Sequence, residues 1–162
     1  MESFVMPLCK WLQFSWWATN IRTSYWVYPF IQLIHFTGLS LWLGTNVAGD
    51  LRLLNIGKKP QTVVDVRDEL FVWNWIGFCV AVTGGFLLFS SRATLYIVNP
   101  AFRVKLMMMV PLALIFHIFV QAKTPIWGKK AEVPAFGKLA GLLELLLWLG
   151  VVIAAVEIPS FG

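Results

Sequence analysis

Long apolar stretches alternate with short polar connectors along most of this chain. A helix needs about 20 largely apolar residues to cross a bilayer, and four stretches have that length. They predict membrane-spanning helices over about Tyr25–Ala48, Phe71–Ser90, Pro100–Ala122 and Leu139–Glu157. Short connectors between consecutive spans favour an up-down-up-down four-helix bundle. We therefore predict an all-α integral membrane protein whose 162 residues form a single membrane domain.

Local signals refine the predicted spans. Asn99 and Pro100 are a side-chain N-cap followed by proline at the first helical position of the third span. Pro111 predicts a kink, or a freed backbone carbonyl, inside that span. The other three spans carry glycines, which let helix backbones approach closely. These glycines are Gly38, Gly44, Gly77, Gly84, Gly85, Gly141 and Gly150.

The N-terminal segment has a different pattern. Between residues 3 and 20, apolar side chains recur at helical spacing, and three tryptophans lie among them: Trp11, Trp16 and Trp17. Tryptophan is enriched at the membrane–water interface, so we predict an amphipathic helix that lies on the membrane surface. The segment lacks the basic region and the small-residue cleavage site of a signal peptide. We therefore expect it to be retained.

Composition supports the membrane class. Hydrophobic residues make up 59% of the chain, charged residues only 13%, and the mean hydropathy is +0.74. A soluble domain carries about 25% charged residues, because a water-facing surface needs them. The net charge of +5 comes from basic residues that lie singly at the ends of apolar stretches. This distribution is typical of membrane flanks rather than of a nucleic-acid-binding surface.

The basic residues also predict an orientation. The two longer connectors lie on one side of the membrane and carry eight of them: Arg52, Lys58, Lys59, Arg67, Lys123, Lys129, Lys130 and Lys138. The opposite side carries five: Lys10, Arg22, Arg92, Arg103 and Lys105. Cytoplasmic loops are enriched in Lys and Arg. We therefore expect the two longer connectors in the cytoplasm and both termini outside.

The two histidines, His35 and His117, both fall inside predicted spans. An ionisable group in the bilayer core costs roughly 2.5–3.5 kcal/mol on insertion scales, so it is a functional candidate. Haem iron takes one axial ligand from each face of its macrocycle, and a bundle offers facing helices to supply both. The two histidines differ in depth by roughly 7–8 Å, which tilt and the Pro111 kink can absorb. We therefore expect one haem b held by His35 and His117; the alternative is that each only hydrogen-bonds a neighbouring helix.

Other polar side chains extend this interpretation. Asn46 and Asp50 share the His35 face of the first span, so that face should contact protein or cofactor rather than lipid. At the start of the third span, Arg103 and Lys105 are candidate partners of the haem propionates. Plain interfacial flanking is the alternative role for these two cations.

Glu144 lies inside the apolar fourth span, several residues beyond Lys138. Hydrocarbon disfavours a lone carboxylate, so we expect Glu144 to be protonated or to pair with a neighbour such as Asn74, His117 or a lysine. Two roles are open for it. It relays protons or touches a quinone, or it is a carboxylic acid that bridges two helices.

Several short motifs carry a resemblance to known proteins: Trp26-x-Tyr28-Pro29, Gln32-Leu-Ile-His35-Phe-Thr-Gly38, Leu51-Arg-Leu-Leu54, Asn99-Pro-Ala-Phe-Arg103-x-Lys105 and Phe116-His117. Together they resemble a bacterial family of small four-helix membrane proteins of unknown function, from about Trp17 to the start of the fourth span. More loosely, the chain is similar to the CopD-like copper-resistance and cytochrome b561-like bundles. In haem-binding members of that group, paired transmembrane histidines ligate haem b. The resemblance implies a ligand role for His35 and His117 and a location in the bacterial inner membrane. Cytochrome b561 proteins usually have more histidines and two haems, and this chain departs from that pattern.

These features predict a small membrane subunit that binds one haem b. It would pass electrons between a quinone pool and a partner protein within a larger complex. Short connectors leave no room for a soluble catalytic domain, so we do not expect a complete enzyme. One alternative is a cofactor-free structural or anchoring subunit that packs against partner subunits and lipid. The other is a proton-coupled transporter that uses His35, His117 and Glu144.

Overall fold

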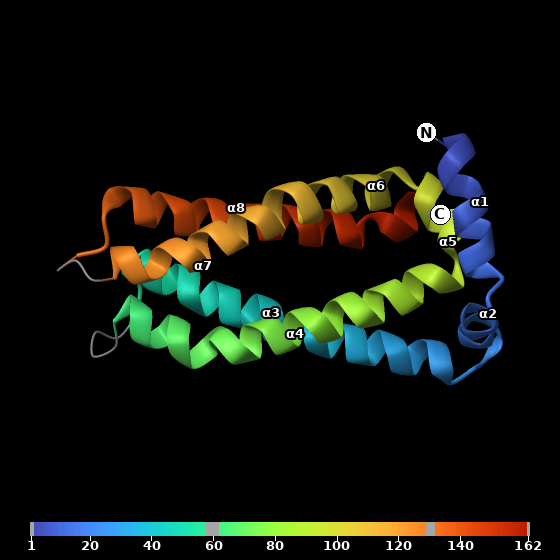
Figure 1. Cartoon of the computed structure of the whole chain (residues 1–162), viewed down its shortest axis with the longest axis horizontal. Coiled ribbons are helices and arrows are strands. Elements are labelled where there is room, and N and C mark those ends of the chain that lie inside the picture. The colour runs from blue at the N-terminus through green and yellow to red at the C-terminus, as the bar shows by residue number, and fades with distance from the viewer. Residues whose placement is uncertain (1, 58–61, 129–131, 162) are drawn as a thin grey trace.

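A computed structural model of the chain describes residues 2–57, 62–128 and 132–161. Long helices run side by side through most of the molecule, and two short helices lie across one end of them (Figure 1). In chain order the helices are α1 (Glu2–Gln13), α2 (Trp16–Thr23), α3 (Val27–Leu53), α4 (Val63–Ser91), α5 (Ala93–Val98), α6 (Pro100–Met107), η1 (Met108–Leu114), α7 (Ile115–Trp127), α8 (Ala135–Val156) and η2 (Ile158–Phe161). The predicted all-α architecture is confirmed for the described residues.

Within these ranges, three helices are long and apolar enough to cross a membrane: Val63–Ser91, Pro100–Trp127 and Ala135–Ser160. They correspond to α4, to the continuous segment from α6 to α7, and to α8 with its C-terminal extension. α3 has 27 residues, which is about 40 Å of helix, but polar side chains spread along it lower its hydropathy. The chain is therefore a helical membrane protein with at least three candidate spans.

The helices are longer than the predicted spans. α4 begins at Val63 because Thr62 and Asp65 form a capping box. The Thr62 hydroxyl accepts a hydrogen bond from the Asp65 backbone N–H at 3.1 Å, and the Asp65 carboxylate accepts one from the Thr62 N–H at 2.8 Å. α3 and α7 also extend past their predicted ends, to Leu53 and Trp127. Backbone hydrogen bonding continues beyond the apolar part of each stretch, so hydropathy alone underestimates helix length.

The third long segment begins as predicted. The Asn99 side chain accepts a hydrogen bond from the Phe102 backbone N–H at 3.1 Å, and Pro100 occupies the first helical turn. The distortion predicted at Pro111 takes the form of a π-helical stretch over Met108–Leu114. Proline has no N–H to donate to the preceding turn, so the hydrogen-bonding register widens around it.

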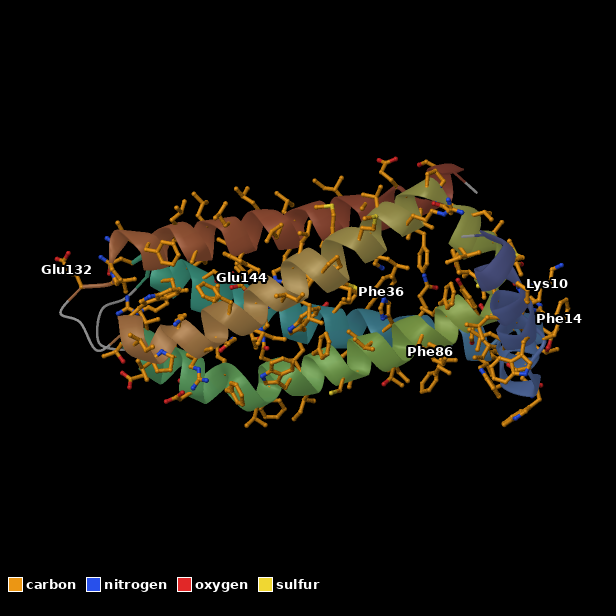
Figure 2. All side chains as sticks on the ribbon, turned by 45° about the horizontal axis from the view of Figure 1, so that its top comes forward. Lys10, Phe14, Phe36, Phe86, Glu132 and Glu144 are labelled. Carbon is orange, nitrogen blue, oxygen red and sulfur yellow. The ribbon has the colours of Figure 1, made fainter. Side chains whose placement is uncertain are left out.

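The prediction of one N-terminal helix over residues 3–20 is wrong, because the chain breaks between α1 and α2. The Ser15 hydroxyl donates to the Leu12 carbonyl at 2.7 Å and accepts from the Ala18 N–H at 3.4 Å. A serine that bonds the backbone in this way caps a new helix instead of continuing the old one. Figure 2 shows Lys10 and Phe14 on the outside of this end of the molecule.

α1 and α2 are tied to the end of the bundle where both chain termini lie (Figure 1). Cys9 and Leu12 of α1 pack against Ala93 of α5. Arg22 of α2 donates to the carbonyl of Ser91 at 2.9 Å, at the C-terminus of α4. This hydrogen bond satisfies a terminal helix carbonyl that has no partner within its own helix.

Glycines bring the backbones of α3 and α4 into contact. A methyl group placed on Gly38 would lie 2.5 Å from the Ala81 nitrogen, and one placed on Gly77 would lie 2.7 Å from the Trp42 nitrogen. These separations are shorter than any van der Waals contact, so only glycine fits. The predicted role of small residues in helix packing is confirmed at both positions.

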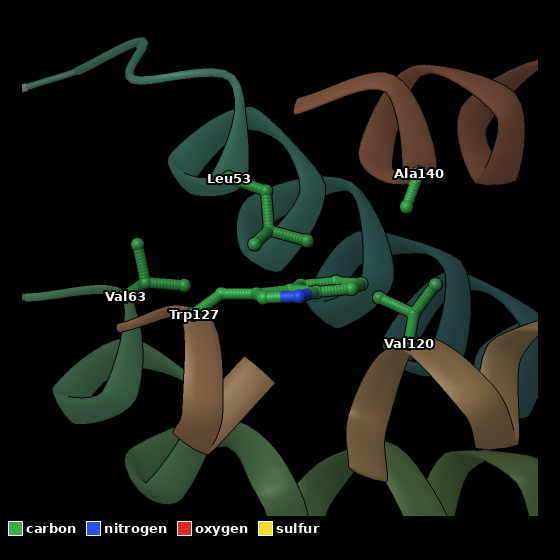
Figure 3. Packing of buried hydrophobic residues seen from close by; sticks show 5 residues of the cluster. All are labelled: Leu53, Val63, Val120, Trp127 and Ala140. Atoms are coloured by element: carbon green, nitrogen blue, oxygen red, sulfur yellow. The ribbon is translucent and has the colours of Figure 1, made fainter. Parts of the chain in front are cut away.

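The two longer connectors lie at the opposite end of the bundle, which we call the connector end. An apolar cluster of its own lies there. Figure 3 shows Trp127 of α7 extending between Val63 and Val120, with Leu53 and Ala140 nearby. All five side chains are buried. The cluster joins all four long segments, and polar side chains lie one layer deeper.

Candidate functional site

Buried polar side chains from all four long segments meet beneath the connector-end cluster. Asn46 and Asp50 come from α3, Asn74 from α4, His117 from α7 and Glu144 from α8, and none is more than 4% exposed. Figure 2 shows Glu144 inside the bundle. Buried polar groups are costly unless they bond one another, so their partners define the chemistry of the site. We call these five residues the polar cluster.

Asn74 is held at its amide nitrogen by two residues of α3. The Asn74 Nδ2 donates to the Thr45 hydroxyl at 2.9 Å and to the Asn46 Oδ1. The Thr45 hydroxyl donates its own proton to backbone carbonyls of α3, at 2.9 and 3.0 Å. Both amide protons of Asn74 are therefore used, and its Oδ1 remains as an acceptor.

That acceptor determines the tautomer of His117. The His117 Nε2 lies 3.1 Å from the Asn74 Oδ1, and an amide oxygen cannot donate. Nε2 must therefore carry a proton. The other ring nitrogen, Nδ1, is bonded to Glu144 Oε1. These two atoms share one proton, either as a carboxylic acid that donates to neutral imidazole or as an imidazolium that donates to a carboxylate.

Asp50 adds a second carboxyl to the pair. Its carboxyl group lies against that of Glu144, within hydrogen-bonding range. Neither Asp50 Oδ2 nor Glu144 Oε2 accepts a hydrogen bond from another described side chain. Two ionised carboxylates in contact repel strongly where water is excluded, whereas a proton between them bonds both. The arrangement is therefore suited to binding protons at Asp50 and Glu144.

A small cavity of ≈ 20 Å³ extends from the polar cluster toward the connector end. Its lining includes Arg67, Gln121 and Thr124 on that side. Arg67 is held by Asp68 at 2.6 Å and by the ring of Phe71, whose centroid lies 4.8 Å from the guanidinium carbon. The cavity is large enough for about one water molecule.

Aromatic side chains cover the opposite side of the polar cluster. The rings of Trp42 and Trp75 lie 6.1 and 5.9 Å from the ring of His117, centroid to centroid. Trp42 in turn packs against Trp148 at 4.3 Å and Phe78 at 4.7 Å. This aromatic layer (Trp42, Trp75, Phe78 and Trp148) contains no titratable group. It separates the polar cluster from the half of the bundle that holds the termini.

His35 is not part of the polar cluster. It is half-buried between α3 and α4, and its Nδ1 donates to the Ala81 carbonyl at 2.7 Å. Gly84 and Gly85 make room for it, because a methyl group on either would lie within about 3 Å of a His35 atom. This glycine pair therefore accommodates a histidine of the neighbouring helix.

The described residues do not fit the predicted bis-histidine haem. His35 is bonded at Ala81 and His117 at Asn74, which are seven residues and about 10 Å apart along α4. Axial ligands must face each other across one iron. Both ring nitrogens of His117 already have protein partners, and Trp42 of the aromatic layer packs against its ring.

Arg103 and Lys105 also lie outside the polar cluster. The Arg103 Nε donates to the Ile97 carbonyl at 2.7 Å, where α5 turns into α6. Lys105 is partly buried on α6. Both belong to the half of the bundle near the termini. The expectation that they contact a propionate stays a prediction.

The prediction that Glu144 pairs with a neighbour is confirmed: of the candidates Asn74, His117 and a lysine, its partner is His117. The interior positions of Asn46 and Asp50 are confirmed as well. The sequence did not predict that these four residues form one polar cluster with Asn74, nor that His35 lies outside it. The available signal was Asn74 itself, a carboxamide inside the apolar stretch 71–90. Four of the lysines on which the predicted membrane orientation rests lie outside the described residues: Lys58, Lys59, Lys129 and Lys130.

Comparison with known proteins adds little to this site. No protein-family model matches the chain, and no solved structure matches it. The chain is 26% identical over 76 residues to ABC transporter G family member 45 of Oryza sativa subsp. japonica. That alignment covers 47% of this chain and 6% of the rice protein. So short a match shows no family.

Proposed function

We propose that this chain is a proton-coupled membrane transport protein, or the proton-binding subunit of one, and that His117, Glu144 and Asp50 bind the proton. One observation carries the proposal. An imidazole and two carboxyls from three different helices are bonded in series inside a membrane bundle, with Glu144 in the middle. Intramembrane chains of acidic residues and histidine are typical of proton relays.

The series of hydrogen bonds supports a defined order of proton transfer. A proton that arrives from the connector end binds the Asp50 carboxylate. Asp50 passes a proton to Glu144 as Glu144 passes its own to His117 Nδ1. Asp50 is again a carboxylate, His117 is an imidazolium, and the polar cluster has gained one proton. His117 keeps its Nε2 proton throughout, because Asn74 accepts from it.

We further propose four spans, with α3 as the fourth. Its inner face carries the buried Asn46 and Asp50, while Phe30, Leu33 and Phe36 on its outer face are exposed apolar side chains that suit lipid contact. α1 and α2 then lie at the membrane surface. Their exposed aromatic residues Trp11, Phe14 and Trp16 support this. Bilayer lipid is accordingly a direct partner. The excess of basic residues at the connectors supports a cytoplasmic connector end in a bacterial inner membrane.

The sequence-based haem and electron-transfer hypothesis has no support from the geometry of His35 and His117, so no step is assigned to haem or quinone. A structural or anchoring subunit is the second candidate, and one observation favours it. The same hydrogen bonds that suit proton transfer also bridge α3, α4, α7 and α8, as polar side chains commonly do between transmembrane helices.

A proton-flux assay separates the two candidates. In liposomes that contain purified protein and a trapped pH-sensitive dye, we expect an imposed pH gradient to collapse faster than in protein-free vesicles. Glu144→Gln and Asp50→Asn keep hydrogen-bonding capacity but cannot exchange a proton, so both should assemble normally and lose this flux. Glu157→Gln, at an exposed position beyond the end of α8, is the matched control and should keep it.

A purely structural role predicts the reverse pattern. Glu144→Gln should then behave like the parent, and only Glu144→Ala, which leaves His117 Nδ1 without its partner, should lose stability. Full flux in Glu144→Gln, or no flux above protein-free vesicles in the parent, overturns the proposed proton function.

A further inference from the structure

Apart from the contact between the Asp50 and Glu144 carboxyls, three polar atoms of the polar cluster have no hydrogen-bond partner, and the residues that carry them all line one cavity. They are Asn46 Nδ2, Asp50 Oδ2 and Glu144 Oε2. Their residues are 4%, 3% and 2% exposed. Buried polar groups are almost always satisfied by protein or by ordered water. The three atoms therefore define a binding site that the hydrogen bonds between side chains do not complete.

The chemistry of these atoms specifies the ligand. The Asn46 Oδ1 already accepts from Asn74, so Asn46 presents its N–H groups to the cavity. A carboxyl oxygen has two lone pairs and accepts a further hydrogen bond even when the two carboxyls share a proton. The ligand must therefore accept from Asn46 and donate to Asp50 and Glu144. A bare alkali cation cannot accept from an N–H, and a cavity of ≈ 20 Å³ holds about one water-sized molecule.

We propose that this cavity binds one ordered water molecule, bonded to Asn46, Asp50 and Glu144. The site deepens the proposed function and rests on it for its role. Gln121 also lines the cavity and presents an unpartnered Oε1 on its connector side. The water is then the proton donor to Asp50: one of its O–H bonds breaks as the proton moves to the Asp50 carboxylate. A new O–H bond forms with a proton from the connector end, so the water begins and ends neutral.

The direct test is a structure of the full chain in lipid nanodiscs at a resolution that shows ordered water. We expect one water peak within hydrogen-bonding distance of Asn46 Nδ2 and of both carboxyls. Continuous side-chain contact with no peak among the three residues overturns the proposal. This measurement needs no variant.

A second test uses infrared difference spectra between acidic and alkaline pH, recorded in ordinary water and in ¹⁸O-water. The parent should show a water O–H band that shifts with ¹⁸O, and Asn46→Leu, which fills the cavity, should lose it. Asn20→Leu is the matched control, because Asn20 is exposed on α2, and it should keep the band. A band that persists in Asn46→Leu contradicts the site.

Proton counting separates this inference from the proposed function. The number of protons bound is measured on the parent, and the rate of proton exchange is measured on the parent and on Asn46→Leu. If the water conducts protons to the carboxyls, proton exchange in Asn46→Leu should be slower by about tenfold, the equivalent of one lost hydrogen bond. Unchanged exchange in Asn46→Leu rejects the water path and leaves proton binding at Glu144 intact. Loss of proton binding in the parent rejects the proposed function instead.

Discussion

His117 is the residue on which the arrangement of the polar cluster depends. Its Nε2 donates to Asn74, and its Nδ1 shares a proton with Glu144. Removing one partner of a buried pair leaves a polar group unsatisfied and costs about 1–3 kcal/mol, so each member holds the next in place. His35, by contrast, donates from Nδ1 to a backbone carbonyl. The two histidines of the chain therefore carry their obligatory protons on different nitrogens.

This difference leads to a prediction for nitrogen-15 NMR of the protein in lipid bilayers. His117 should keep a protonated Nε2 at every pH, because Asn74 Oδ1 can only accept. His35 should have a protonated Nδ1, because the Ala81 carbonyl can only accept. The single variants His35→Gln and His117→Gln assign the two sets of signals, since the chain has two histidines. An unprotonated Nε2 on His117 contradicts the hydrogen-bond assignment and the proton path built on it.

At the scale of elements, the register between helices decides which side chains meet. α3 and α4 touch backbone to backbone at Gly38 and Gly77. This contact brings Asn46 and Thr45 to the level of Asn74. The π-helical stretch around Pro111 immediately precedes α7. Beyond it, His117, Val120, Thr124 and Trp127 face the interior at regular spacing.

Glycine substitutions test this contact. Gly38→Ala should destabilise the bundle by about 1–3 kcal/mol, because the new methyl group meets the α4 backbone and the helices must separate. Gly44→Ala is the matched control on the same helix. A methyl group there has no atom within 4 Å, so this change should be neutral or stabilise the helix by up to about 1 kcal/mol. Thermal unfolding in nanodiscs measures both. Equal effects of the two substitutions would contradict close α3–α4 packing.

Helix register also decides whether the two histidines can ligate the same haem iron. Because His35 and His117 are bonded about 10 Å apart along α4, they should not ligate one iron. Protein purified from haem-supplemented cells should lack a low-spin bis-histidine spectrum, and His35→Ala should not change its absorption. A Soret band that turns high-spin in both His35→Ala and His117→Ala would support the haem hypothesis. It would also require a different arrangement of α3 and α7.

Across the whole molecule, polarity is distributed unevenly. The cavity and the polar cluster lie in the half of the bundle near the connector end. The aromatic layer follows them toward the termini. α1 and α2 cover the end where the termini lie (Figure 1). In the proposed function, the proton would therefore arrive at Asp50 from the connector end, where Arg67 and Gln121 line the cavity. Access from the other end requires the aromatic layer to move.

The orientation of this asymmetric molecule is testable by cysteine labelling. In a background with Cys9 and Cys79 replaced by serine, Lys59→Cys and Lys130→Cys should resist a membrane-impermeant thiol reagent in intact cells. Both connectors are expected in the cytoplasm, because they carry eight of the thirteen basic residues. Lys10→Cys, at an exposed position on α1, should label strongly. The opposite labelling pattern would reverse the orientation and place the proton entrance outside.

The sequence by itself determined the membrane class, the helical architecture and the positions of the long segments. Apolar stretches of this length have no other stable arrangement than helices in a bilayer, and caps such as Asn99–Pro100 act within a few residues. The sequence also indicated that Glu144 needs a polar partner, because a carboxyl in hydrocarbon is costly, and it offered Asn74, His117 or a lysine.

Only the tertiary structure decided which polar residues share a site. His35 and His117 looked equivalent along the chain, since both lie inside apolar helices. Whether they meet depends on helix register and rotation, which glycine contacts between α3 and α4 and the π-helical stretch at Pro111 determine. These are contacts between distant segments, and periodicity within one helix carries no information about them. For the same physical reason Asp50 and Asn74 joined the site, and His35 did not.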